Sequence, residues 1–299
     1  MERAIAILRL NKIGNKVGLK HVGWLIILLK LIVATYFVYL LVDGLRVGAF
    51  EFGQKFVWFI VAGFVAQLID GALGMAYGAS CTSLLLWFGI PPKFASASVH
   101  TAEIFTTGVS GLSHIRFANI NKKLFFQIAI TGSIGAIIGA YLIADLFDGN
   151  AVKPFVSFYL LLLGVYLLYK AFRRKKITHK KVKRAPLLAF VGGLLDAIGG
   201  GGWGPIVTSN LLSRGKSPRY TVGTVNTAEF FVTYFATAVF IFLLGVQHME
   251  IVLGLIIGGV AAAPLGAYVA SRINPRLLLI LVGILVVLIS SWGVVSHFL

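Results

Sequence analysis

Long apolar runs alternate with short polar segments along most of the chain. Seven of these runs have about the 20 residues that an α-helix needs to cross a bilayer. They cover residues 22–42, 96–116, 124–147, 154–172, 219–244, 250–271 and 277–298. Two further apolar stretches, 56–90 and 186–212, are interrupted by glycine. The pattern predicts an all-α integral membrane protein with about seven transmembrane helices and two glycine-broken segments.

The second broken segment has five glycines within the six residues from Gly199 to Gly204. Each glycine costs a helix about 1 kcal/mol relative to alanine, so this run should divide the helix into two halves. Pro205 suits the first turn of the second half, where its missing N–H is not needed. Irregular backbone persists in a bilayer only where it is buried in protein or lines a wet cavity. The break is therefore a candidate binding site.

The two broken segments belong to an internal duplication. When the chain is shifted by 126 residues, 18 of the 45 positions from Gly63 to Thr107 match an identical residue, which is far above chance. The identical pairs that could carry chemistry are Asp70 and Asp196, Gly78 and Gly204, Thr82 and Thr208, Ser83 and Ser209, Thr101 and Thr227, and Glu103 and Glu229. Both halves are expected to share one architecture.

Composition supports a membrane protein and excludes two other classes. Of the 299 residues, 58% are hydrophobic and only 12% are charged, which is too apolar for a soluble globular protein. The net charge of +17 comes from basic residues spread over short loops, as the positive-inside rule predicts, so nucleic acid is not an expected partner. Cys81 is the single cysteine, which excludes an intramolecular disulfide. No cofactor is predicted.

The basic loops also predict the topology. If each broken segment enters and leaves on the same side as a hairpin, the basic loops 116–123, 173–184, 214–219 and 272–276 all face the cytoplasm, together with the basic N-terminus. Each copy then has one hairpin and three spans, an odd number of crossings, so the second copy is inverted. The predicted parts are an N-terminal tail and additional helix (1–55), repeat 1 (56–172), a basic linker (173–185) and repeat 2 (186–299).

A polar stripe follows each broken segment. Its members in the first copy are spaced as one face of a helix: Ser96, His100, Glu103, Thr107, Ser110 and His114. Asn226, Glu229 and Thr233 repeat its centre. A carboxylate at membrane depth costs several kcal/mol unless it is paired, hydrated or protonated. Glu103 and Glu229 are therefore predicted either to couple transport to protons or to hold the fold together.

For His100 and the two aspartates, metal or cation binding is weighed against other roles. His100 and Glu103 are three residues apart, as in some metal sites, but no third ligand is near in the sequence, so no metal is predicted. His100 is expected instead to bind substrate or to relay a proton. Asp70 and Asp196 fall at the ends of the first half-helices, where we favour capping of the glycine turn over cation coordination.

The N–H groups that begin each second half-helix could bind an anion, because they carry the positive end of the helix dipole. The alternative is that these groups and the neighbouring hydroxyls are only helix caps. The predicted substrate-binding residues are Gly78, Ser80, Thr82, Ser83, His100, Thr101, Gly201, Gly202, Gly204, Thr208, Ser209, Asn226 and Thr227. The expected partners are a small anion, the lipid bilayer and a coupled proton.

A glycine-rich break followed by a Thr-Ala-Glu helix, twice in one chain, resembles the TauE/SafE sulfite exporter family. The resemblance covers residues 56–298, with one departure at Ala79, where the second copy has Pro205. It implies transport of sulfite, sulfonates or other small organic anions across the cytoplasmic membrane. Because the sequence has no nucleotide-binding domain and no Walker-type loop, we expect a secondary transporter, with export as the direction, and no enzymatic activity. An anion channel is the alternative, and an intramembrane hydrolase using His100 and Glu103 is less favoured because it lacks a nucleophile or metal set.

Overall fold

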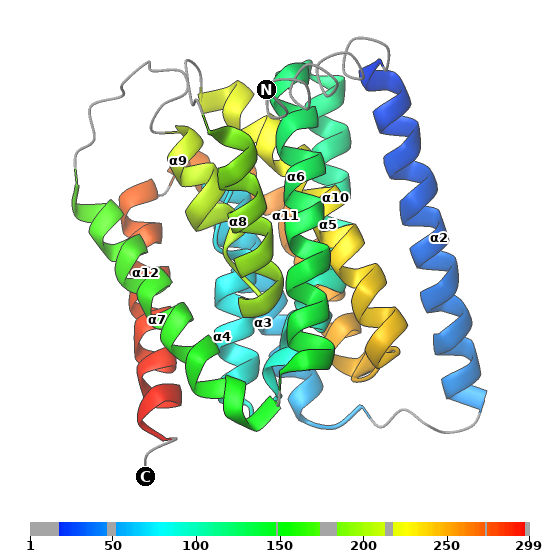
Figure 1. Cartoon of the computed structure of the whole chain (residues 1–299), viewed down its shortest axis with the longest axis vertical. Helices are drawn as coiled ribbons and strands as arrows, with labels where there is room; N and C mark the ends of the chain where they lie inside the picture. Colours follow the sequence, from blue (N-terminus) through cyan, green and yellow to red (C-terminus); the bar gives the residue numbers. More distant parts are fainter. Residues whose placement is uncertain are drawn as a thin grey trace.

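The structure is a computed structural model that describes residues 18–46, 52–147, 149–173, 184–212, 218–272 and 274–296. All secondary structure in these ranges is helical, and the long helices run between two ends of the molecule, called the upper and lower ends as they lie in Figure 1. The helices in chain order are α2 (Leu19–Arg46), α3 (Lys55–Leu73), α4 (Tyr77–Trp87), α5 (Pro92–Arg116), α6 (Lys122–Tyr141) with η1 (Leu142–Leu146), α7 (Gly149–Phe172), α8 (Ala185–Gly199), η2 (Trp203–Thr208), α9 (Ser209–Leu212), α10 (Pro218–Leu244), α11 (Met249–Arg272) and α12 (Pro275–Val295). Most of the basic tail and of the 173–185 linker lies outside the described residues.

The first broken segment is hairpin 1, made of α3 and α4, and both of its outer ends lie at the lower end of the molecule (Figure 1). Helix α3 ends at Leu73, and Gly74 follows in the left-handed conformation with φ of 66°. This conformation suits glycine, because it has no Cβ to clash with the carbonyl of the preceding turn. Helix α4 then starts at Tyr77. The predicted break is confirmed.

The second broken segment is hairpin 2, made of α8, η2 and α9, and it opens toward the upper end (Figure 1). Gly200, the duplicate of Gly74, is also left-handed, with φ of 65°. The second half starts at Trp203 as wide π-helical turns, and Pro205 lies in the first of them. The glycine cluster thus divides this segment at the predicted place.

The predicted spans correspond to seven long helices, but only part of the prediction is confirmed. In the described chain, five helices are long and apolar enough to cross a membrane: residues Leu19–Arg46, Lys122–Leu146, Ala151–Phe172, Tyr220–Leu244 and Arg276–Val295. Helix α5 has 25 residues but is less apolar, because it carries the polar stripe. Its polar side chains, among them Ser96, His100 and Glu103, are buried against other helices instead of facing lipid.

Glycines allow the first half of each hairpin to touch a helix of the other copy. Helix α3 packs along α11, and α8 packs along α6. A Cβ at Gly63 would lie 2.5 Å from the carbonyl oxygen of Leu255, and a Cβ at Gly193 would overlap the carbonyl oxygen of Gly132. Contact between backbones is how small residues hold membrane helices together.

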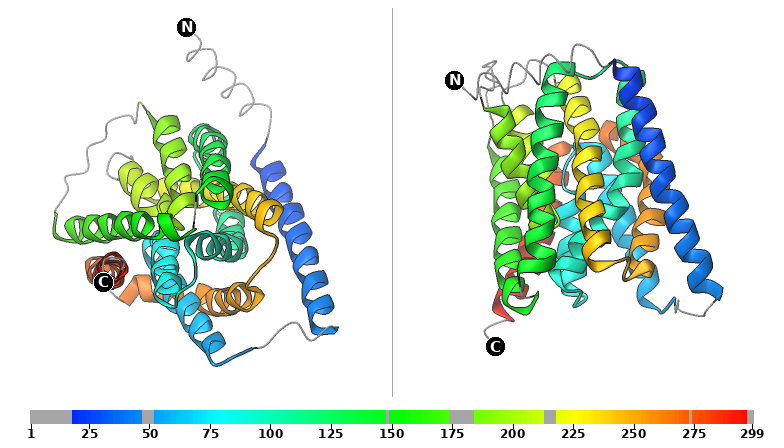
Figure 2. Two further views of the ribbon diagram at one scale, coloured as in Figure 1. Left: turned by 60° about the horizontal axis from the view of Figure 1, so that its bottom comes forward. Right: turned by 45° about the vertical axis from the view of Figure 1, so that its right-hand side comes forward.

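Helix α2 stands at the edge of the bundle and contacts α5 (Figures 1 and 2). Its one internal charge, Lys30, lies over Gly108, and its Nζ donates to the carbonyl oxygen of Phe105 at 3.3 Å. The side chain of Lys30 therefore faces protein, with its alkyl stem packed along α5.

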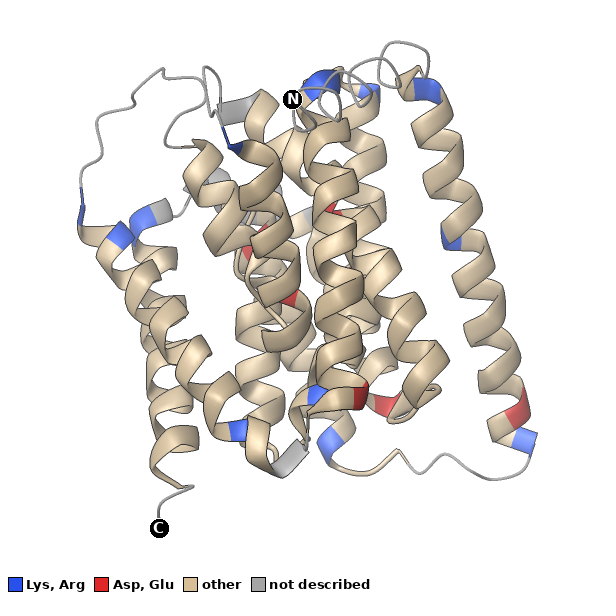
Figure 3. Cartoon of the chain, in the orientation of Figure 1, with Lys and Arg blue, Asp and Glu red and all other residues tan. Residues whose placement is uncertain are grey.

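Charges are distributed unequally between the two ends (Figure 3). Among the described residues, acidic side chains outside the centre of the molecule occur only at the lower end, near the end of α2, in η1 and at the start of α11. The upper end carries the basic starts of α6 and α12 and the basic end of α7. A second group of acidic residues lies inside the bundle, where the hairpins meet.

The close α3–α11 contact predicts that a larger side chain at Gly258 destabilises the protein. A Cβ there would overlap the carbonyl oxygen of Ile60 and lie 2.6 Å from the backbone nitrogen of Phe64. Because backbone atoms cannot rotate away, we expect Gly258→Leu to lower the free energy of unfolding by about 1–3 kcal/mol. Ala261→Leu, on the exposed face of the same helix, is the matched control. Equal melting temperatures of the two variants in detergent would contradict this packing.

Candidate functional site

The tips of the two hairpins meet inside the bundle, backbone against backbone. A Cβ at Gly78 would lie 2.7 Å from the carbonyl oxygen of Gly200 and 2.9 Å from the Cα of Gly201. A Cβ at Gly204 would lie 2.8 Å from the Cα of Met75. The glycines therefore allow the two tips to touch, and no space for an ion separates them at these points in this conformation.

A side-chain hydrogen bond joins the second half of hairpin 1 to the tip of hairpin 2. The Thr82 hydroxyl donates to the carbonyl oxygen of Gly200 at 2.7 Å. That carbonyl belongs to the broken backbone after α8, where helical partners are missing. The predicted substrate-binding residue Thr82 thus stabilises the opposite hairpin in this conformation.

Two duplicated aspartates cap the starts of the second half-helices. One carboxylate oxygen of Asp196, Oδ1, accepts hydrogen bonds from the backbone N–H groups of Gly202 at 2.6 Å and Trp203 at 2.9 Å. Asp70 accepts one from the N–H of Tyr77, the residue equivalent to Trp203. The carboxylates therefore occupy helix-start N–H groups that were predicted to bind an anion, as the capping alternative requires.

His100 connects the polar stripe of α5 to the tip of hairpin 2. Its Nδ1 lies 2.9 Å from the carbonyl oxygen of Ser96, which can only accept, so Nδ1 carries a proton. Its Nε2 lies 3.3 Å from the Oδ2 of Asp196. A hydrogen bond between Nε2 and this carboxylate therefore requires one additional proton, on either group. The imidazole and Asp196 are 0% and 4% exposed, respectively.

Four carboxyl groups gather around the hairpin tips. Glu103 lies close enough to Asp70, Asp196 and Glu229 for their charges to interact, and Glu229 interacts in the same way with both aspartates. The Oε1 of Glu103 lies 3.4 Å from the position that a Cβ of Gly78 would take. The structure thus brings the sequence-predicted carboxylates of both repeats together at one place.

The other predicted hydroxyl and amide groups divide into two sets. Thr101 and Thr227 donate to carbonyl oxygens one turn earlier in their own helices, at 2.7 Å each, so they contribute little to a site in this conformation. Asn226 donates to the Ser110 hydroxyl at 3.4 Å, joining the two polar stripes. Among the predicted substrate-binding residues, Ser80, Ser83 and Thr208 have buried hydroxyls without a hydrogen-bond partner in the described part of the chain. Buried hydroxyls of this kind are unusual and are candidates for ligand contacts.

Sequence reasoning missed two polar residues of α7 that contact hairpin 2. The Tyr159 hydroxyl donates to the carbonyl oxygen of Gly201 at 3.1 Å. The Lys170 Nζ donates to the hydroxyl of Ser209 at 2.7 Å. Neither residue lies in a motif or within the duplicated 45 positions, so only the packing of α7 against hairpin 2 reveals them. Lys170 places a cation beside a predicted substrate-binding serine.

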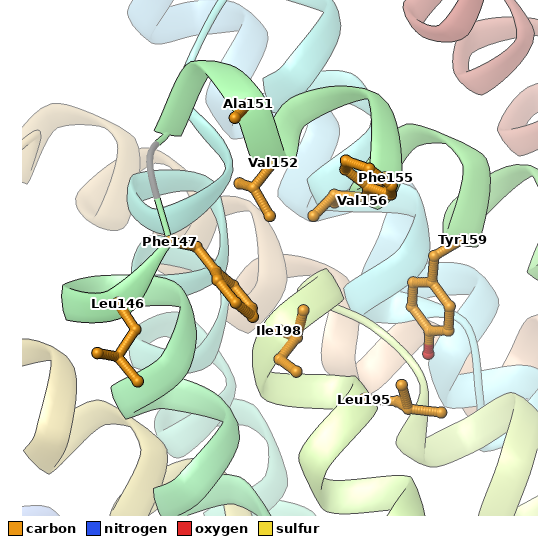
Figure 4. A pocket seen from close by; sticks show the side chains of 9 residues that line it. All are labelled: Leu146, Phe147, Ala151, Val152, Phe155, Val156, Tyr159, Leu195 and Ile198. Atoms are coloured by element: carbon orange, nitrogen blue, oxygen red, sulfur yellow. The ribbon is translucent and has the colours of Figure 1, made fainter.

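An apolar cavity of about 470 Å³ lies between η1, α7 and α8 (Figure 4). Its lining is apolar except for Tyr159, and Figure 4 shows this side chain on the same side as Leu195 of α8. Because the lining offers a single hydroxyl, the cavity suits lipid chains better than a small anion. Within the described residues, no cluster of three or more His, Cys, Asp and Glu residues could hold a metal ion.

Comparison with known proteins identifies the family. The model of the family "Sulfite exporter TauE/SafE" matches residues 59–292, which include both glycine breaks and exclude α2. The chain is 45% identical over 255 residues to "Probable membrane transporter protein YtnM" of Bacillus subtilis (strain 168), covering 82% of this chain and 85% of that protein. "Probable membrane transporter protein YunE" of the same organism is 21% identical over 263 residues, covering 79% of this chain and 96% of the relative.

A comparison with solved structures finds no match. The family match covers both glycine breaks and both Thr-Ala-Glu helices, and it confirms the resemblance that these motifs indicated. The chain belongs to the TauE/SafE sulfite exporter family of membrane transporters.

Proposed function

We propose that the protein is a secondary transporter that exports small sulfur-containing or organic anions, such as sulfite or sulfonates, across the cytoplasmic membrane. The observation that carries this proposal is the meeting of two broken helices, tip to tip, beside four carboxyl groups. Glu103 and Asp196 are buried, and Asp70 and Glu229 are half-buried. Broken helices that meet inside the membrane are typical of secondary transporters. The substrate class comes from the family, whose printed description names sulfite.

Two inverted repeats, 56–172 and 186–299, are part of this proposal. The helices of the first copy, shifted by 126 residues, fall on those of the second: α3 on α8, α5 on α10, α6 on α11 and α7 on α12. The helix contacts repeat in the same way: α3 packs on α11, and their equivalents in the other copy, α8 and α6, pack on each other. Hairpins that open toward opposite ends fit an axis in the membrane plane (Figure 1).

The closed tips favour a transporter over a channel. Backbone contacts at Gly78, Gly201 and Gly204 leave no passage between the tips. Transport then requires the hairpins to separate toward one end at a time, as in alternating access. An open channel would need a continuous polar path past the same contacts.

The central carboxyl groups favour coupling to protons. Carboxylates that share a buried space do not all carry a charge at once, and an arriving anion adds to their repulsion. His100 and Asp196 hold a position where one proton can be bound between Nε2 and Oδ2. Loss of the proton from the His100–Asp196 pair makes the centre more negative, so proton release and departure of the anion are electrostatically linked.

The function is tested with purified full-length protein in proteoliposomes loaded with sulfite. We expect saturable sulfite efflux that accelerates when a pH gradient is imposed, since proton movement supplies the driving force. Empty liposomes are the control for leakage. Efflux that does not saturate and ignores the pH gradient would favour the channel, and absence of flux for sulfite and short sulfonates would overturn the substrate class.

The carboxyl groups generate a second prediction. Glu103→Gln and Glu229→Gln keep the side-chain shape and remove the ionisable group, so we expect a drop of at least tenfold in gradient-driven efflux with little change in melting temperature. Asp145→Asn, an exposed carboxyl group in η1, is the matched control. Unchanged efflux and pH dependence combined with lower stability would assign the glutamates to the fold alone.

The topology is tested by cysteine labelling in intact cells. We propose that the upper end of the molecule, where α2 begins, faces the cytoplasm, because the basic helix ends gather there (Figure 3). The native Cys81 is buried and should not react. A membrane-impermeant maleimide is expected to label Gln247→Cys and to spare Ala118→Cys until the cells are permeabilised. The reverse pattern would overturn the orientation.

A further inference from the structure

A small cavity lined by both polar and apolar residues lies between α4, α7 and α12 at the lower end, apart from the contact between the hairpin tips. Its volume is about 100 Å³, and its polar lining comes from Ser83, Lys153, Ser157, Ser290 and Ser296. Because a water molecule occupies about 30 Å³ in the liquid, the cavity has room for an ion of only a few atoms.

Two hydroxyls in this cavity lack a hydrogen-bond partner among the described residues. They belong to Ser83 and Ser290, whose residues are 0% and 3% exposed. A buried hydroxyl without a partner is destabilising, and native proteins usually satisfy it with protein, water or ligand. Both hydroxyls can donate to an oxygen atom placed in the cavity.

The charge of the lining selects an anion. Lys153, at the start of α7, lines the cavity and is partly buried, and none of the described residues that line it is acidic. A cation would meet the lysine without a compensating carboxylate. An oxyanion would accept hydrogen bonds from the serines and a charge-assisted one from the lysine.

A lysine also contacts the duplicate of Ser83 in the other hairpin. Ser83 in α4 and Ser209 in α9 are duplicates, and each belongs to the second half of a hairpin. At Ser209 the Nζ of Lys170 donates to the hydroxyl at 2.7 Å. Lys153 and Lys170 lie toward opposite ends of α7, separated by roughly 25 Å at 1.5 Å per residue. One helix thus supplies a lysine near the duplicated serine at both ends of the molecule.

We propose that the cavity formed by Ser83, Lys153 and Ser290 binds a small oxyanion as a station on the outer side of the transport route. This inference rests on the proposed function, because it gives the exported anion a second position after the hairpin tips. Lys170 and Ser209 form the corresponding pair on the cytoplasmic side. An exported anion would then move from the Lys170–Ser209 pair, past the hairpin tips, to the Lys153–Ser83 pair.

The test uses two tryptophans, Trp87 and Trp292, that line the cavity and report occupancy by their fluorescence. Purified full-length protein is titrated with sulfite, sulfate and methanesulfonate, with chloride as the control for ionic strength. We expect saturable fluorescence changes with at least one of the sulfur oxyanions. Lys153→Gln should raise Kd by about tenfold, which corresponds to about 1.4 kcal/mol, and Ser290→Ala by roughly threefold to tenfold.

Matched controls separate the site from general effects. Lys55→Gln removes an exposed lysine at the same end, and Ser133→Ala removes another buried, unpartnered serine outside the cavity. Kd values for the controls should equal the wild-type value. Equal effects of the site and control variants would overturn the proposal, and so would an absence of saturable binding to the wild-type protein.

Further outcomes distinguish a lipid headgroup from a free anion, and failure of this site from failure of the proposed function. If anionic phosphatidylglycerol changes the fluorescence and free oxyanions do not, the cavity holds a lipid headgroup and the proposal is wrong. If wild-type protein transports sulfite in liposomes while Lys153→Gln transports with unchanged concentration dependence, the outer station is wrong but the function stands. Oxyanion binding lost in Lys153→Gln, in a protein that transports no anion, would retain the site and refute the transporter.

Discussion

The structure depends on one constraint, that broken backbone inside a bilayer must find its hydrogen-bond partners within the protein. The two hairpins meet this constraint together. Asp196 accepts from the first N–H groups after the break in hairpin 2, and Thr82 of hairpin 1 donates to a carbonyl oxygen on the other side of that break. The break in hairpin 2 is thus supported partly by its own repeat and partly by the other. Motion of one hairpin necessarily changes the environment of the other, which is the coupling that alternating access needs.

Much of the fold could be predicted from the sequence because its signals are local. Glycine clusters set the breaks at Gly74 and Gly200, apolar runs set the helices, and the polar spacing on α5 identified its buried face. The duplication also identified the four carboxyl groups that the structure places at the hairpin tips. These predictions needed only periodicity, helix propensity and the cost of burying charge.

Contacts between distant segments could not be predicted in the same way. Tyr159 and Lys170 lie on one helix without a recognisable motif, and their roles depend on how α7 packs against hairpin 2. The spacing of the tips was also invisible to sequence reasoning, which placed an anion where glycine backbones now touch. The capping role of Asp196 was one of two alternatives, and the distances to Gly202 and Trp203 establish that role in this conformation.

The exchange of packing partners between the repeats has a consequence for biosynthesis. Helix α3 is complete early in translation, yet the α11 residue Leu255, against which Gly63 packs, is synthesised 192 residues later (255 minus 63). At about 5–20 residues per second, that interval is roughly 10–40 s. During it, the first hairpin has broken backbone and an ionisable group but no final neighbour. The membrane insertion machinery or a chaperone must shelter hairpin 1 from lipid until the second half of the chain emerges. A chain whose synthesis stops early therefore keeps hairpin 1 unpacked and should be degraded by proteases.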